Sequence, residues 1–176
     1  MRRLLPALGL LLAPAVALAA SAFTLASPTL VAGGSMPLAN VYIECGGGNQ
    51  SPALRWHDAP AGTRSYAVTM FDPGAHFWHW VAFDIAVGAH GLNAGAGTPR
   101  SGNAPGDTVQ LQNDFGHAGY AGPCPPAGTP HHYVITVYAL DVPELGPVAR
   151  FSRQDALAAI AKHTLAKATL TVTWGR

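Results

Sequence analysis

Short runs of β-branched, aromatic and alternating apolar side chains recur along the chain, and each run predicts a β-strand. The runs lie at residues 23–25, 42–43, 65–71, 78–85, 132–140 and 168–174. The run at 132–140 is the clearest of them, whereas 23–25 and 42–43 are weak. Because the strands are short and no regular helices alternate with them, the sequence predicts a mainly β fold, an antiparallel β-sandwich.

One segment near the C-terminus has helical spacing instead. Ser152 can cap a helix, and Asp155 three residues later can complete a capping box. Apolar side chains then recur at helical spacing as far as Leu165, and Lys162 and Lys167 lie in the later turns, where cations are favoured. The sequence therefore predicts a C-terminal helix followed by a closing strand. By contrast, residues 88–122 are rich in Gly, Ala, Asn and Pro, which predicts a long loop around a functional site.

The N-terminus has the order of charge and apolarity that is typical of a signal peptide. Arg2 and Arg3 precede an apolar run to Ala20, and Ala17-Leu18-Ala19 fits the cleavage rule. We expect residues 1–19 to be the signal peptide, with cleavage near 19–22, and residues 20–176 to be a single exported domain, periplasmic or secreted. The alternative is an uncleaved membrane anchor, which the marginal length and two prolines of the run disfavour.

The charge balance argues against a nucleic-acid partner. The full chain has a net charge of +1, and loss of Arg2 and Arg3 would leave 8 basic against 9 acidic side chains. No broad basic face is therefore expected. No later segment is apolar and long enough to cross a membrane, so we expect no membrane span after signal cleavage.

Two cysteines, Cys45 and Cys124, lie in Gly- and Pro-rich loops. An exported chain meets an oxidising compartment, where such a pair favours a disulfide. Two free thiols are the alternative, and a metal site is a further one that lacks the close Cys-x-x-Cys spacing.

The tripeptide Trp78-His79-Trp80 lies at the start of a predicted strand. Residues i and i+2 share a strand face, so the spacing predicts both indoles on one face and the imidazole on the other. Taken alone, His79 fits a buried core histidine as well as it fits a ligand-binding one.

Other polar side chains also lie at predicted strand ends. Asp72 ends one strand, and His131 and Tyr133 open another with i, i+2 spacing. A turn cap at Asp72 and a cross-strand polar pair at His131 and Tyr133 are the structural alternatives. Together with His79, these side chains can bind an anion such as phosphate, because imidazole and phenol donate hydrogen bonds. Glycine backbones in the adjoining loops can add N–H donors.

Several motifs occur in the order seen in one known family. They are Ser51-Pro52-Ala53-Leu54-Arg55-Trp56, Ala59-Pro60-Ala61-Gly62-Thr63, Phe71-Asp72-Pro73, Trp78-His79-Trp80-Val81, Asn113-Asp114-Phe115-Gly116, Gly119-Tyr120, Gly122-Pro123-Cys124-Pro125-Pro126 and His131-His132-Tyr133. The chain thereby resembles the phosphatidylethanolamine-binding proteins, most of all their bacterial, kinase-inhibitor-like branch. The resemblance runs from about Phe23 to Trp174.

The resemblance implies the β-sandwich of that family with a pocket for phosphate or phospholipid headgroups. The implied pocket residues are Asp72, His79, His131 and Tyr133, with Gly122 and Pro123 in its wall and Tyr120 at its border. The loops of Cys45 and Cys124 match loops of the bacterial branch, which fits a local disulfide. One departure is Gly74, because the family usually has a second aspartate there.

The leading hypothesis is therefore an exported protein that binds a phosphate-like anion or a phospholipid headgroup, without a cofactor. The resemblance also implies that the protein modulates another protein, although it identifies no partner, and an exported chain would not meet cytosolic kinases. The alternative is a hydrolase that uses a His/Asp pair as general base, with Tyr133 as proton donor. A zinc site of His79, His131 and Asp72 is a third hypothesis without a recognisable metal signature.

Overall fold

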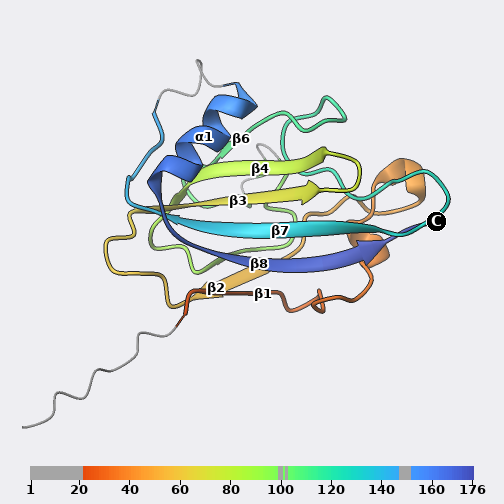
Figure 1. Ribbon diagram of the computed structural model, residues 1–176, viewed down its shortest axis with the longest axis horizontal. Helices are drawn as coiled ribbons and strands as arrows, with labels where there is room; N and C mark the ends of the chain where they lie inside the picture. The colour runs from red at the N-terminus through yellow and green to blue at the C-terminus, as the bar shows by residue number, and fades with distance from the viewer. Residues whose placement is uncertain (1–21, 99–100, 102, 147–151) are drawn as a thin grey trace, which may run out of the picture.

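The protein folds into two antiparallel β-sheets, as the computed structural model in Figure 1 shows. The structure describes residues 22–98, 101, 103–146 and 152–176. The predicted signal peptide, residues 1–19, lies outside the described residues. The strand order is β6-β4-β3-β7-β8 in the larger sheet and β1-β2-β5 in the smaller one. The predicted mainly β, antiparallel architecture with one helix near the C-terminus and a closing strand is confirmed.

The strands of the larger sheet are long at its centre and short at one edge. They are β3 (Ser65–Asp72), β4 (Phe77–Ala86), β6 (Val109–Gln110), β7 (His131–Leu140) and β8 (Thr164–Trp174). The smaller sheet consists of β1 (Thr24–Ala26), β2 (Leu54–His57) and β5 (Gly91–Leu92). The four strongest predicted strands thus become the four long strands, and the weak candidate at 23–25 overlaps β1.

The hydrophobic core has two parts, one on each face of the larger sheet. The larger part lies between the sheets and includes Trp56 from β2 and Trp80 from β4. The smaller part lies under the helix α1 (Arg153–His163), where Ala156 and Ile160 pack with Phe83. Both faces of the sheet are thereby covered, which explains the near-continuous apolar run of its central strands.

Helix α1 has the predicted cap but ends before the predicted end. The Ser152 side chain accepts from the Asp155 amide at 3.1 Å, and the Asp155 carboxylate accepts from the Ser152 amide at 3.1 Å. The placement of Leu165 and Lys167 in the helix is wrong, because β8 begins at Thr164. Lys167 pairs with Tyr138 of β7, and this ladder outweighs the local helical spacing.

The strand predicted at Tyr42-Ile43 is also wrong. The chain there forms two short 3-10 helices, η1 (Leu38–Asn40) and η2 (Ile43–Cys45). The Tyr42 amide donates to the Pro123 carbonyl at 3.1 Å, so this backbone bonds to a loop rather than to a sheet. In the predicted loop at 88–122, the chain adds the short strands β5 and β6.

A β-bulge in β4 puts Trp78 and Trp80 on different faces of the sheet, so the prediction that both indoles share one face is wrong. Trp80 pairs with Met70, but Trp78 pairs with Phe71, so one extra residue, His79, lies between the two pairs. A bulge of this kind breaks the alternation of faces. As a result, Trp80 lies in the core between the sheets, whereas Trp78 packs against the core under α1.

Within the described part of the chain, α1 is too short to span a bilayer, and no other helix is long and apolar enough either.

Candidate functional site

Three neighbouring strands of the larger sheet bring their polar ends together around a cavity of about 140 Å³. Because β3 lies between β4 and β7 and is antiparallel to both, its last residue meets their first residues. Asp72 ends β3, His79 is near the start of β4, and His131 and Tyr133 open β7. The cavity is lined by Asp72, Ala75, Phe77, His79, Phe115, Cys124, Pro125, Pro126, His131 and Tyr133. Four of the predicted site residues are therefore in one place.

Asp72 is a buried carboxylate, 2% exposed, with three hydrogen bonds. Its Oδ1 accepts from the amides of Gly74 at 2.9 Å and Ala75 at 3.2 Å. Its Oδ2 lies 2.6 Å from Nδ1 of His131. Such bonds offset the cost of burying a carboxylate.

Gly74 continues the turn that holds this carboxylate. A Cβ atom at this position would lie 3.3 Å from Oδ1 of Asp72 and 4.0 Å from Nδ1 of His131. A second carboxylate there would add a like charge beside Asp72. Among the described lining residues, Asp72 is the only acid.

His79 faces the cavity with a ring that is almost fully buried, 3% exposed. Its Nδ1 lies 2.8 Å from the carbonyl oxygen of Ala121. Burial lowers the pKa of His79, and the carbonyls of Ala121 and Gly122 and the charges of Asp72 and Asp114 offset that effect only in part.

Tyr133 is 1% exposed and lies edge-on to His79, with 5.2 Å between the ring centroids. Burial, together with the nearby charge of Asp72, raises the pKa of Tyr133 far above neutral pH. The phenol therefore stays protonated and can donate a hydrogen bond to an anion.

Two phenylalanines also line the cavity, and the sequence analysis did not assign them to the site. The ring centroids of Phe77 and Phe115 are 4.7 Å apart, and Phe115 stacks on Tyr42 at 4.3 Å. Asn113 shapes the turn that presents Phe115, since its Oδ1 accepts from the amides of Phe115 at 3.0 Å and His117 at 3.2 Å. The motif Asn113-Asp114-Phe115-Gly116 was the available signal for this turn.

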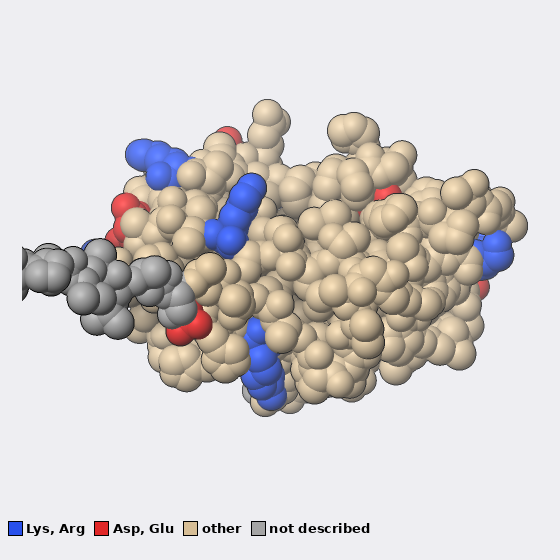
Figure 2. All heavy atoms as spheres, turned by 60° about the horizontal axis from the view of Figure 1, so that its bottom comes forward, with Lys and Arg blue, Asp and Glu red and all other residues tan. Residues whose placement is uncertain are grey.

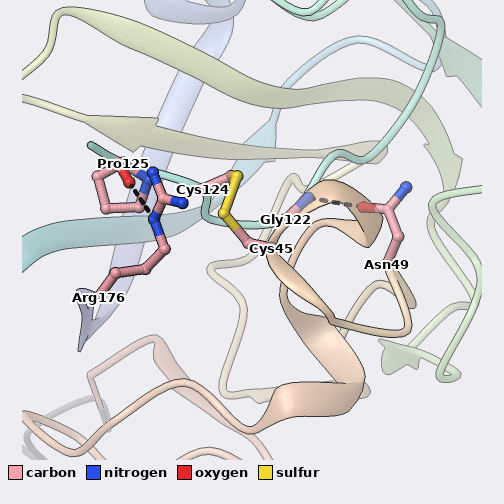
Figure 3. Close-up of a disulfide and its surroundings, with 6 residues drawn as sticks. All are labelled: Cys45, Asn49, Gly122, Cys124, Pro125 and Arg176. Atoms are coloured by element: carbon pink, nitrogen blue, oxygen red, sulfur yellow. Dashed lines mark hydrogen bonds between the residues drawn. A yellow bond between two sulfur atoms is a disulfide. The ribbon is translucent and has the colours of Figure 1, made fainter. Parts of the chain in front are cut away.

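Cys124, Pro125 and Pro126 complete the wall. The predicted disulfide is present: it joins Cys124 to Cys45, with 5.6 Å between the Cα atoms. Figure 3 shows this link together with a hydrogen bond of 3.0 Å from Nε of Arg176 to the Pro125 carbonyl. Because proline has no N–H to donate, these two links hold a segment that cannot bond as an ordinary strand does.

The remaining predicted site residues do not line this cavity. Tyr120 donates from its hydroxyl to the Asn40 carbonyl at 2.6 Å, and burial raises its pKa. The Gly122 amide donates to Oδ1 of Asn49 at 2.8 Å (Figure 3). Pro123 accepts from the Tyr42 amide at 3.1 Å. All three therefore hold this loop against residues 40–49.

Surface charge and metal-binding groups add little to this site. On the face turned forward in Figure 2, Lys, Arg, Asp and Glu are few and separated, with no extended patch of one sign. Across the described residues, no three His, Cys, Asp or Glu side chains are arranged to hold a metal ion. The zinc hypothesis for His79, His131 and Asp72 thus gains no support from their geometry.

The buried His79 is expected to make stability depend on pH. Below a pH of about 6.5 the unfolded chain protonates this histidine, while the folded ring, with its lowered pKa, resists the proton. The free energy of unfolding should therefore fall as pH drops from about 6.5, by at most about 1.4 kcal/mol per pH unit for this residue. Urea unfolding at several pH values would show a shallower slope in His79→Phe than in the wild type. A His132→Asn control changes an exposed histidine, and equal slopes in the wild type and His79→Phe would contradict the prediction.

The fold and the cavity together define a class of protein: an antiparallel β-sandwich with a small cavity, lined by both polar and apolar side chains, at the ends of three strands. Comparison with known proteins gives this class a family. The model of the phosphatidylethanolamine-binding protein family matches residues 26–175. The chain belongs to this family.

Relatives and solved structures agree with that assignment. The chain is 41% identical over 128 residues to the UPF0098 protein YbcL of Escherichia coli K12, covering 69% of this chain and 70% of YbcL. It is 40% identical over 128 residues to the putative lipoprotein LppC of Mycobacterium tuberculosis, covering 70% of this chain and 58% of LppC. The crystal structure of Escherichia coli YbcL matches with a TM-score of 0.83 at 33% identity, covering 89% of this chain and 99% of that one.

Proposed function

We propose that the protein binds a small phosphate-bearing molecule, free or as the headgroup of a phospholipid, in the cavity of Asp72, His79, His131 and Tyr133. The observation that carries this proposal is the pair of His131 and Asp72 at 2.6 Å, beside the protonated phenol of Tyr133. The carboxylate orients the imidazole, and the phenol can donate to phosphate oxygens. The imidazole can donate to them from Nε2 when its ring carries both protons, because its Nδ1 hydrogen is bonded to Asp72. The family name, phosphatidylethanolamine-binding protein, supports a ligand of this chemistry.

The aromatic side of the cavity supports the same ligand class. Phe77 and Phe115 line the cavity beside the polar groups, and their rings pack against His79 and limit the access of water to it. Hydrogen bonds to a charged ligand are stronger where water is excluded. A headgroup would place its phosphate at the polar end and its carbon atoms against these rings.

We also propose that the protein acts outside the cytoplasm, in the periplasm or as a secreted protein. The apolar N-terminal run with its small-residue exit supports export. The disulfide of Cys45 and Cys124 suits an oxidising compartment. LppC, a relative, is named a putative lipoprotein.

Calorimetric titration of the mature protein with phosphate and with phosphoethanolamine tests the binding proposal. We expect saturable binding that weakens by about tenfold or more in a variant with His79→Ala and His131→Ala, since each group contributes a hydrogen bond to a charged ligand. A folded wild type that binds neither compound would contradict the proposal. If the protein instead releases phosphate from phosphoethanolamine, the same His131–Asp72 pair acts as a general base and the hydrolase alternative takes its place.

A further inference from the structure

The imidazole of His79 is fixed in one orientation by the backbone beside it. Nδ1 lies 2.8 Å from the Ala121 carbonyl oxygen. The Ala121 amide in turn donates to the His79 carbonyl at 2.9 Å, so the strand and the loop are joined twice at this point. A carbonyl oxygen can only accept a hydrogen bond, so Nδ1 of His79 carries the hydrogen.

Aromatic rings surround this imidazole and keep water away from it. The ring centroids of Phe77, Tyr133 and Phe115 lie 4.7, 5.2 and 6.0 Å from that of His79. Such an environment favours the neutral form of a histidine.

The charged groups that face His79 are already paired with other groups. The Asp72 carboxylate is bonded to His131 at 2.6 Å. The Asp114 carboxylate pairs with Arg153 at 2.5 Å. These partners weaken the pull of both carboxylates on a proton at His79, and burial therefore remains the dominant effect on its pKa, which is lowered.

A neutral ring with its hydrogen on Nδ1 has a lone pair at Nε2, which accepts a hydrogen bond and cannot donate one. The hydroxyl of Tyr133 is a donor in the same cavity, and His131, whose Nδ1 is bonded to Asp72, is a second donor when its ring carries both protons. Among the described residues, no fully buried side-chain nitrogen or oxygen lacks a partner, so Nε2 of His79 opens to the cavity. The site thus combines donors for anion oxygens with one acceptor at the cavity surface. An anion without a hydrogen would leave Nε2 of His79 without a hydrogen bond, because its lone pair would face a lone pair of an anion oxygen.

We propose that the cavity selects tetrahedral anions that bring a hydrogen-bond donor of their own, and that Nε2 of His79 accepts that hydrogen bond. Hydrogen phosphate has such an O–H group, and phosphoethanolamine has N–H groups. Sulfate and fluorophosphate have a similar shape and charge but no hydrogen. This inference rests on the proposed function, since it requires an anion in the cavity.

The affinities of these anions, measured separately, provide the test. Calorimetric titrations of the mature protein at mildly alkaline pH would compare hydrogen phosphate with sulfate and with fluorophosphate. We expect sulfate and fluorophosphate to bind about ten- to hundredfold more weakly, the cost of an acceptor that loses its access to water and gains no hydrogen bond.

Two substitutions assign the selectivity to one atom. In His79→Asn the amide nitrogen can take the place of Nδ1 and still donate to Ala121, but no atom occupies the place of Nε2. We expect phosphate to lose affinity while sulfate does not, so that the two bind within about threefold of each other. In His79→Gln the longer side chain returns an acceptor to the cavity and should restore part of the preference for phosphate.

Each result separates the inference from the function on which it rests. His132 is an exposed residue of β7, next to His131 in sequence, and His132→Asn should leave the ratio of phosphate to sulfate affinity unchanged. Equal binding of phosphate and sulfate by the wild type would overturn the inference while leaving anion binding intact. Full discrimination in His79→Asn would overturn the role of His79. No binding of any of the three anions would overturn the inference and the proposed function together.

Discussion

Replacing Gly122 with alanine is expected to lower the free energy of unfolding by about 4 kcal/mol or more, a loss of the size seen only where backbone or core packing is broken. A Cβ atom at Gly122 would lie 2.1 Å from the Asn40 carbonyl oxygen and 2.6 Å from the Tyr42 amide nitrogen. Both are backbone atoms, so neither can rotate out of the way. The glycine is therefore required for the close approach of the loop, rather than for a contact with the ligand.

The loop has little freedom to relieve this clash. The Gly122 amide is bonded to Asn49, the Pro123 carbonyl accepts from Tyr42, and Cys124 is linked to Cys45. Thermal and urea unfolding of Gly122→Ala would measure the loss. Gly88→Ala is the matched control, because a Cβ there meets no atom within 4 Å, and its effect should stay within about 0.5 kcal/mol. Equal stability of the two variants would contradict the packing argument.

Replacing Asp72 with asparagine is expected to weaken phosphate binding by at least about tenfold and to lower the free energy of unfolding by about 3 kcal/mol. The carboxylate accepts three hydrogen bonds, two from amides and one from His131. An amide group of the same shape has two possible orientations. Its N–H2 points either toward the backbone amides of Gly74 and Ala75 or toward Nδ1 of His131. In the first case buried donors face one another. In the second case Nδ1 must give up its hydrogen to accept, so the ring can no longer carry both protons beside an oriented negative charge.

A second His/Asp pair in the same chain gives the control for this prediction. Nδ1 of His163 lies 2.8 Å from Oδ1 of Asp141, but the Asp141 side chain is 49% exposed, against 3% for the Asp72 side chain. Asp141→Asn should therefore cost no more than about 1 kcal/mol and leave phosphate affinity unchanged. Calorimetric titration and urea unfolding of both variants would show the contrast. A loss of affinity as large in Asp141→Asn as in Asp72→Asn would refute the role of the cavity pair.

The long strands could be predicted from sequence because each has enough alternating or β-branched residues to specify one conformation. The strands β2, β5 and β6 have four residues or fewer, and such short segments are defined by their partners rather than by their own pattern. Lys167 shows the same limit, since its helical spacing is real but its strand partner on β7 outweighs it. Trp78 was misplaced because no local signal marks the bulge at His79.

The polar half of the site was predictable for a different reason. Asp72, His131 and Tyr133 lie at strand ends, where spacing alone brings polar side chains to one edge of a sheet. Phe77 and Phe115 give no such signal, because an apolar ring of the cavity wall looks in sequence like a ring of the core. Tyr120 was placed at the border, yet its hydroxyl is taken by the Asn40 carbonyl.

The central pairing of the larger sheet also determines the order in which the protein can fold. β3 and β4 are neighbours in sequence and can form a hairpin early, but the other edge of β3 pairs with β7, joining residues as distant as Ser65 and Leu140. Until β7 arrives, that edge of an apolar strand stays open to unwanted strand pairing with other chains. Topologies dominated by such distant pairings fold slowly, in about milliseconds to seconds. The hairpin of β3 and β4 is therefore the part of the chain that most needs protection from aggregation before β7 closes the sheet.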